Sequence, residues 1–208
     1  MLNLPKKKGT EDKKYRYHKC VIAFDQSYAR TGVAVAVDGE LVFISSIKLK
    51  KLKNKTEKRK TVRKGAQQIL DHYLKKYDKE DICVFVERIR TFTQTNDFRP
   101  AYLKSIGALT CAIVDEAIDR GIKAYSIDTR AWKSKVLGTC KPSLEPIEGV
   151  KNPQKFASVR KIIELGHEKD LRLTNGSGGF LSYDDDAADA ACIALYGFCG
   201  TINVLEES

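Results

Sequence analysis

The chain begins with apolar runs that have the pattern of buried strands. Residues 21–24 and 82–86 are continuous apolar runs, as expected for strands covered on both faces of a sheet. Between them, residues 31–37 and 40–49 are rich in Val and Ile and flank Asp38-Gly39, a dipeptide that favours the tight turn of a hairpin. A short fifth strand is predicted over residues 123–128.

Segments with a helical period follow the third and fourth strands. Apolar residues spaced by three and four positions predict a long helix over residues 62–77, and a basic segment, residues 48–64, leads into it. A second helix is predicted over residues 103–117, with Gly121 in the position of a C-terminal cap.

The last third of the chain contains two more predicted helices. Asn152-Pro153 has the form of an N-cap followed by proline at the first helical position, so a helix is expected from there to residue 165. Residues 166–183 are rich in Gly and are predicted to be a flexible connector. The closing helix is expected to start at residues 184–186 and to run to Cys199.

This order of elements predicts an α/β fold. A hairpin followed by alternating strands and helices indicates a mixed five-stranded sheet, three antiparallel strands and then parallel strands, with helices on both faces. A length of 208 residues with 42% hydrophobic residues supports one core. We expect one domain over residues 19–200, between a basic mobile tail, residues 1–18, and a C-terminal tail, residues 201–208.

The charge of the chain indicates a polyanionic partner. Lys and Arg number 37 against 27 Asp and Glu, a formal net charge of +10, which favours nucleic acid. No segment carries the roughly 18 uninterrupted apolar residues of a membrane span, and the start of the chain lacks the apolar region of a secretory signal. We therefore expect no membrane partner and a cytoplasmic location. The six cysteines form no C-x-x-C pair, so neither a zinc site nor a disulfide framework is indicated.

Carboxylates follow both buried strand runs. Asp25 and Glu87 each come directly after the last apolar residue, so parallel neighbouring strands would bring both to one edge of the sheet. Either acid alone is more simply interpreted as a solvated strand end. Crowded carboxylates repel one another, and a shared divalent cation is the simplest explanation for such a pair.

A third acidic site opens the closing helix. Asp186 and Asp189 lie three residues apart on one helix face, with alanines beside them that allow close approach to the sheet. Capping accounts for Asp184 or Asp185 but not for Asp189, and the sequence leaves open whether Asp185 or Asp186 is a ligand. Acids at these positions suit two Mg²⁺ ions that bridge a scissile phosphate, with Mn²⁺ as a substitute.

These motifs resemble a known family. Residues 22–27, Ile-Ala-Phe-Asp-Gln-Ser, and residues 31–35, Thr-Gly-Val-Ala-Val, resemble the I-D-P-G-x-x-x-T-G opening of RuvC. Residues 84–89 resemble its second acidic strand, and Asp186-Ala187-Ala188-Asp189-Ala190 resembles its closing D-A-A-D-A motif. The resemblance covers residues 20–199.

The resemblance implies an RNase H-like fold and magnesium-dependent cutting of four-way (Holliday) DNA junctions. It also implies a homodimer formed through the helix at residues 103–117, with Asp25, Glu87, Asp186 and Asp189 as catalytic metal ligands. Gln26-Ser27 replaces the family's Pro-Gly, and Asp185 stands where bacterial RuvC usually has His. These departures point to a divergent version of phage or viral type.

The predicted DNA-binding residues fall into three groups. The family's aromatic residue after the second acid has no match at Arg90, and Phe92 is a possible substitute. The full set comprises Lys50, Lys51, Lys53, Lys55, Lys58 and Arg59 before and within the first helix; Arg88, Arg90 and Phe92 after the second acid; and Lys133 and Lys135.

Three other functions suit parts of this sequence. Sugar kinases and actin-like ATPases share the opening strand and hairpin, but they need a second lobe for which this chain is too short. An RNase H-like nuclease acting on RNA or RNA–DNA hybrid, of the YqgF type, would suit the same acids. A DNA-binding relative without catalysis is disfavoured because all four acids are present.

Overall fold

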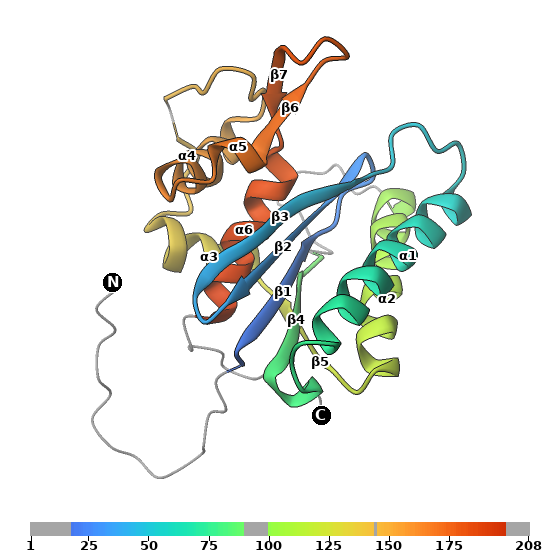
Figure 1. The fold of residues 1–208 in the computed structure, drawn as a ribbon. Helices are drawn as coiled ribbons and strands as arrows, with labels where there is room; N and C mark the ends of the chain where they lie inside the picture. Colours follow the sequence, from blue (N-terminus) through green and yellow to red (C-terminus); the bar gives the residue numbers. More distant parts are fainter. Residues whose placement is uncertain (1–17, 90–99, 144, 199–208) are drawn as a thin grey trace, which may run out of the picture.

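The computed structural model describes residues 18–89, 100–143 and 145–198, and it has the α/β, RNase H-like architecture expected from the sequence (Figure 1). The main sheet has five strands in the order β3-β2-β1-β4-β5. β2 pairs antiparallel with β1 and β3, and β1, β4 and β5 run parallel. The strands are β1 (Cys20–Asp25), β2 (Arg30–Val37), β3 (Glu40–Lys48), β4 (Ile82–Glu87) and β5 (Lys123–Ile127).

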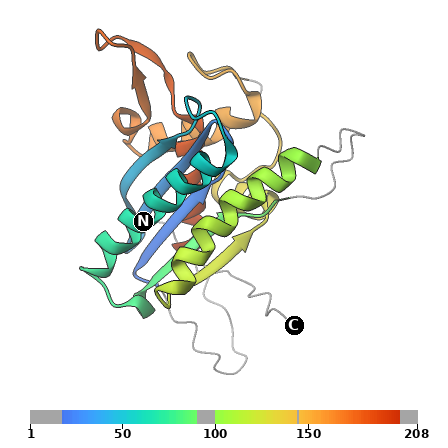
Figure 2. The ribbon, with the colours of Figure 1, turned by 90° about the vertical axis from the view of Figure 1, so that its right-hand side faces the viewer.

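Helices cover both faces of this sheet (Figures 1 and 2). α1 (Lys55–Leu74) and α2 (Pro100–Asp119) lie side by side on one face, and α6 (Asp185–Phe198) crosses the other. Each face has its own apolar cluster. Along β1, Cys20, Ile22 and Phe24 pack toward α1 and α2, whereas Val21 and Ala23 pack toward α6. This two-sided burial explains the continuous apolar run.

The alternation of side chains along a strand also determines on which face of the sheet the acids lie. Asp25 continues the alternation of Val21 and Ala23, and Glu87 continues that of Cys83 and Phe85, so both acids fall on the α6 side. The parallel pairing of β1 with β4 ends at Phe24 and Val86, and therefore the two acids occupy neighbouring positions at the same sheet edge.

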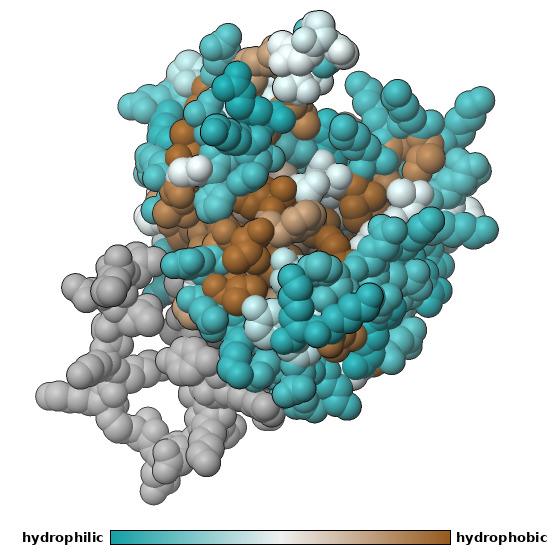
Figure 3. Space-filling model, viewed as in Figure 1, coloured by the Kyte–Doolittle hydropathy of each residue, from teal (hydrophilic) through white to brown (hydrophobic). Residues whose placement is uncertain are grey.

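The hairpin between β2 and β3 forms at the predicted dipeptide. Asp38 has φ 49° and Gly39 has φ 90°, so both residues adopt the left-handed backbone that tight hairpin turns require. β3 is the outer strand of the sheet, and its Val42 and Phe43 are 53% and 40% exposed. Figure 3 shows apolar side chains gathered near the middle of this face of the molecule.

The prediction of a flexible connector over residues 166–183 is wrong. These residues form α5 (Glu168–Leu171) and a second, two-stranded sheet of β6 (Arg172–Thr174) and β7 (Phe180–Tyr183). At its turn the Asn175 side chain accepts hydrogen bonds from the backbone N–H groups of Ser177 and Gly179. The glycines that indicated flexibility therefore belong to an ordered hairpin.

Several short elements complete the fold. The helix expected from Asn152 begins as a 3₁₀ turn, and Asn152 Oδ1 caps it by accepting from Gln154 N at 3.1 Å. The remaining elements are a 3₁₀ turn (Lys79–Asp81), α3 (Thr129–Trp132), a π turn (Lys133–Leu137), the 3₁₀ turn Pro153–Lys155 and α4 (Phe156–Glu164).

Some expectations concern residues outside this description. The basic tail is expected at residues 1–18, of which only His18 is described, and the C-terminal tail at 201–208 also lies outside the described residues. Arg90 and Phe92 lie outside them too. Within the described ranges, no helix combines the length and apolar composition of a membrane span.

α6 approaches β2 closely at Gly32. A Cβ atom at this position would lie 1.9 Å from the backbone carbonyl oxygen of Asp186. The helix start and the sheet are in direct main-chain contact here, and this contact fixes the distance of Asp186 from the strand ends.

We predict that Gly32→Ala lowers the free energy of unfolding by about 1–3 kcal/mol or more, because the new methyl group meets backbone that cannot move aside by a side-chain rotation. Urea unfolding would measure the loss. Gly176→Ala is the matched control, since nothing lies within 4 Å of the added Cβ there. A Gly32→Ala protein as stable as wild type would contradict the close packing.

Candidate active site

Two of the predicted site residues lie at the carboxyl ends of β1 and β4. Asp25 is only 4% exposed, and Glu87 is partly buried beside it. The Thr129 hydroxyl, at the start of α3, donates a hydrogen bond to Glu87 Oε1. The strand ends thus bring two carboxylates together in a region with little access to water.

The other two predicted acids come from the first turns of α6. Asp189 is 3% exposed, and Asp186 is partly exposed. Asp184 is the cap of this helix: its Oδ1 accepts from Ala187 N at 3.1 Å, and its Oδ2 accepts from Ser46 Oγ at 2.5 Å. Asp184 is therefore occupied in holding the helix start, and Asp186 faces the site.

Lys155 joins three of these acids. Its Nζ lies 2.9 Å from Asp25 Oδ2, 3.3 Å from Asp186 Oδ1 and 2.6 Å from Asp189 Oδ2. Lys155 ends the 3₁₀ turn before α4, far along the chain from β1. One ammonium group therefore bridges the end of β1 and the start of α6.

The electrostatics of the site show how crowded the acids are. Burial, together with repulsion from Asp25 and a hydrogen bond shared with it, raises the pKa of Glu87 to about 8. Burial raises the pKa of Asp186 to about 7, although Lys155 opposes this shift. Burial also raises the pKa of Asp189.

For the pKa of Lys155, attraction to neighbouring charges outweighs burial. Burial by itself would lower the pKa of the amine, but attraction to Asp189, Asp25 and Asp186 outweighs burial and raises this pKa well above its ordinary value. Lys155 therefore carries its positive charge throughout the physiological range and partly compensates the negative charge of the acids.

Gln26 connects the two strand ends beyond their backbone pairing. Its Oε1 accepts from Glu87 N and its Nε2 donates to Glu87 O, both at 3.2 Å. The same Nε2 donates to Thr110 Oγ1 of α2 at 2.8 Å. The side-chain amide thus takes the place of the next backbone pair and fixes Glu87 relative to Asp25.

The donor set fits a divalent cation. Four carboxylates are the ligands that Mg²⁺ prefers, and Asp189 Oδ1 is a buried oxygen without a hydrogen-bond partner. Within the described ranges, no group of three or more His, Cys, Asp or Glu side chains is already arranged to hold a metal ion. The Lys155 ammonium lies within 3.3 Å of carboxylate oxygens of Asp25, Asp186 and Asp189.

Most of the first basic group lies on the surface as predicted. Lys50, Lys51 and Lys53 are exposed in the segment between β3 and α1, and Lys55 and Arg59 are exposed on α1. Lys58 differs from them and is removed from the DNA-binding set. It is 7% exposed, and its Nζ donates to the Tyr28 carbonyl oxygen at 2.9 Å. This amine is occupied inside the protein.

The other predicted DNA-binding residues lie apart from this group. Arg88 is exposed directly after Glu87, and Lys135 is exposed on the π turn. Lys133 on the same turn donates from Nζ to Gln154 O at 3.2 Å. The structure therefore leaves Arg88 and Lys135 exposed, and it ties Lys133 to the turn that carries Lys155.

Sequence reasoning missed Lys155, Thr129 and the role of Gln26. Lys155 is one of 37 basic residues and no motif marks it. Thr129 follows a strand, but its contact with Glu87 depends on how β4 and β5 pair. In the sequence, Gln26 stands out only as a departure from the family motif. Its position directly after the first acid was the one available signal.

Comparison with known proteins identifies the fold. RuvC from T. thermophilus in complex with a Holliday junction substrate superposes with a TM-score of 0.59 at 18% identity, over 86% of this chain and 92% of that chain. A second Thermus thermophilus RuvC structure gives 0.55 at 18% identity, over 85% and 92%. The yeast mitochondrial Holliday junction resolvase Ydc2 gives 0.48 at 14% identity, over 89% and 79%.

Neither a protein-family model nor a curated protein matches the sequence. The RuvC structures align over most of both chains. The chain therefore has a RuvC-like fold.

Proposed function

We propose that the protein is a metal-dependent endonuclease that resolves four-way or otherwise branched DNA junctions. The observation that carries this proposal is the meeting of four acids, Asp25, Glu87, Asp186 and Asp189, at one sheet edge of a RuvC-like fold. The net charge of +10 supports a nucleic-acid substrate.

The four acids would hold two Mg²⁺ ions, with Mn²⁺ as a substitute. Bound metal would supply an activated water and stabilise the oxygen that leaves the scissile phosphate. The chain itself fixes the ligands: Gln26 holds Glu87 at the end of β4, and Asp184 holds the start of α6. We choose Asp186 over Asp185 as the ligand because Asp186 contacts Lys155 together with Asp25.

Two alternatives lead to different results in one assay. An RNase H-like nuclease of the YqgF type would cut RNA or RNA–DNA hybrid, and an inert relative would bind DNA without cutting. Incubation with Mg²⁺ and synthetic four-way junction, linear duplex or hybrid distinguishes them. We expect cutting of the junction in preference to duplex and hybrid.

We predict that Asp25→Asn abolishes cutting and leaves junction binding unchanged, because it removes a metal ligand and not the basic surface. Cleavage and gel-shift assays would measure the two effects. Asp186→Asn should lose activity, whereas Asp185→Asn should retain it as the matched control. A fully active Asp25→Asn protein would refute the assignment of the site.

We predict that Mg²⁺ binds more tightly as pH rises from about 6 to about 8 and that affinity then levels off. Glu87 and Asp186, with pKa values of about 8 and about 7 without metal, must lose protons before they coordinate. Calorimetry in buffers of different ionisation enthalpy would detect the released protons. Glu87→Gln should remove the upper part of the pH dependence, and an affinity independent of pH would contradict the prediction.

We predict that neutralising Lys50, Lys51 and Lys53 to Gln weakens binding to every DNA substrate. Each lost phosphate contact should lower the slope of log affinity against log salt by roughly 0.9 on duplex DNA. The matched control neutralises Lys75, Lys76 and Lys79, which are exposed beyond the opposite end of α1. An unchanged salt slope would mean that DNA takes another path.

We also propose a homodimer, since paired cuts in a two-fold symmetric junction need two related sites. Cys111 and Ile118 lie exposed seven residues apart on one face of α2, and Ile118 is 62% exposed. Light scattering should give about twice the chain mass of 23.3 kDa. A strictly monomeric protein that makes paired nicks would contradict this proposal.

A further inference from the structure

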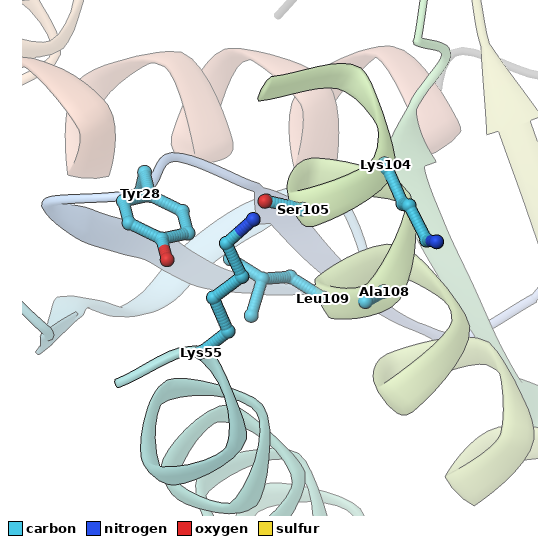
Figure 4. Close-up of a pocket in the computed structure, with 6 residues that line it drawn as sticks. All are labelled: Tyr28, Lys55, Lys104, Ser105, Ala108 and Leu109. Carbon is cyan, nitrogen blue, oxygen red and sulfur yellow. The ribbon is translucent and has the colours of Figure 1, made fainter. Parts of the chain in front are cut away.

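A pocket lies between the start of α1 and the first half of α2. Its volume is about 340 Å³, and it is lined by Tyr28, Lys55, Lys104, Ser105, Ala108 and Leu109. In Figure 4, Tyr28 and Lys104 lie on opposite sides, and Lys55 rises from α1 between them. The predicted DNA-binding set includes Lys55 but none of the other five residues.

The lining chemistry favours an anionic ligand with a flat apolar part. Lys55 and Lys104 supply two amines, and no acid is among the six lining residues. Lys55 is the first residue of α1, where the helix dipole adds positive potential. Ala108 and Leu109 give the pocket an apolar side.

Tyr28 is fixed in place from within the protein. Lys58 Nζ lies 3.8 Å from the centroid of the Tyr28 ring and donates to the Tyr28 carbonyl oxygen at 2.9 Å. This explains the burial of a lysine that the sequence had placed on the DNA path. The ring is therefore positioned before any ligand arrives, which reduces the entropy lost on binding.

The pocket and the acidic site share one short segment, residues 25–28. Asp25 belongs to the acidic site and Tyr28 to the pocket. Between them, Ser27 Oγ donates to Asp186 Oδ2 at 3.3 Å. Gln26 Nε2 donates to Thr110, the neighbour of the lining residue Leu109. The acids lie on the α6 side of the sheet and the pocket on the side of α1 and α2, so a DNA strand that crosses the sheet edge at residues 25–28 would reach both.

We propose that this pocket binds one unpaired nucleotide of the cleaved strand, adjacent to the scissile phosphate. Tyr28 contacts the base, and Lys55 and Lys104 contact the flanking phosphates. The inference rests on the proposed nuclease function. It adds a site that accepts a nucleotide only when that nucleotide is unpaired. The volume lies at the lower end of the range of about 300–1,000 Å³ for ligand sites, which suits a single nucleotide rather than a duplex.

The test places 2-aminopurine, a base whose fluorescence depends on stacking, at each position around the cut in a four-way junction. Binding is measured in EDTA so that no strand is cut. We expect wild-type protein to change the fluorescence at one position next to the scissile phosphate. Ala108→Phe, which fills the pocket without changing charge, should abolish this change and weaken junction binding by at least about fivefold.

Lys104→Gln is the second variant, because an exposed side chain can be replaced without disturbing the fold. We expect it to weaken junction binding about three- to tenfold and to lower the salt slope. Lys75→Gln, at the far end of α1, is the matched control and should leave the fluorescence change in place. Circular dichroism would verify that Ala108→Phe is folded. Because Ala108 lies on the same face of α2 as Cys111 and Ile118, light scattering would verify that the variant keeps the oligomeric state of the wild type.

The outcomes separate this inference from the proposed function. If wild-type protein cuts junctions but shows no fluorescence change, and Ala108→Phe and Lys104→Gln bind as wild type, the pocket assignment is overturned and the nuclease assignment stands. If wild-type protein neither binds nor cuts any branched DNA, both are overturned. A fluorescence change that survives in Ala108→Phe would place the unpaired base elsewhere and also overturn the pocket assignment.

Discussion

Repulsion among buried carboxylates is the constraint on which the rest of this structure depends. Asp25 and Asp189 are almost fully buried, and their negative charges would destabilise the fold if nothing compensated them. Lys155 supplies part of that compensation through contacts of 2.6–3.3 Å to three acids. Breaking such a buried pair leaves an uncompensated charge, so the amine supports the fold as well as the site.

The acids meet because the sheet and α6 are in main-chain contact. Small residues make this possible: Gly32 on β2 lies against the Asp186 carbonyl oxygen, and Ala187, Ala188 and Ala190 are fully buried. A larger side chain at Gly32 would separate the helix start from the strand ends. The same packing that completes the core on the α6 side therefore brings Asp186 and Asp189 to Asp25.

The parts of the site that depend on local sequence pattern could be predicted from the sequence. Asp25 and Glu87 could be placed because a period of two and a buried strand end determine where a side chain points. The role of Lys155 could not be predicted, since its contacts with Asp25 and Asp186 span 130 and 31 residues. The ordered hairpin after α5 was also missed. Its glycines belong to the turn around Asn175, and a Gly-rich segment has the same composition whether it forms an ordered turn or a flexible loop.

Gln26 has a mechanical consequence for the two strand-end acids. Its amide continues the pairing of β1 with β4 by one step, so Asp25 and Glu87 are held by a hydrogen-bonded sheet and not by two independent loops. Adjacent strands lie about 4.8 Å apart, and a sheet resists stretching in that direction. The two carboxylates are thus fixed at a stiff spacing. Their repulsion is relieved by taking up a proton or a cation, because the strand ends cannot move apart.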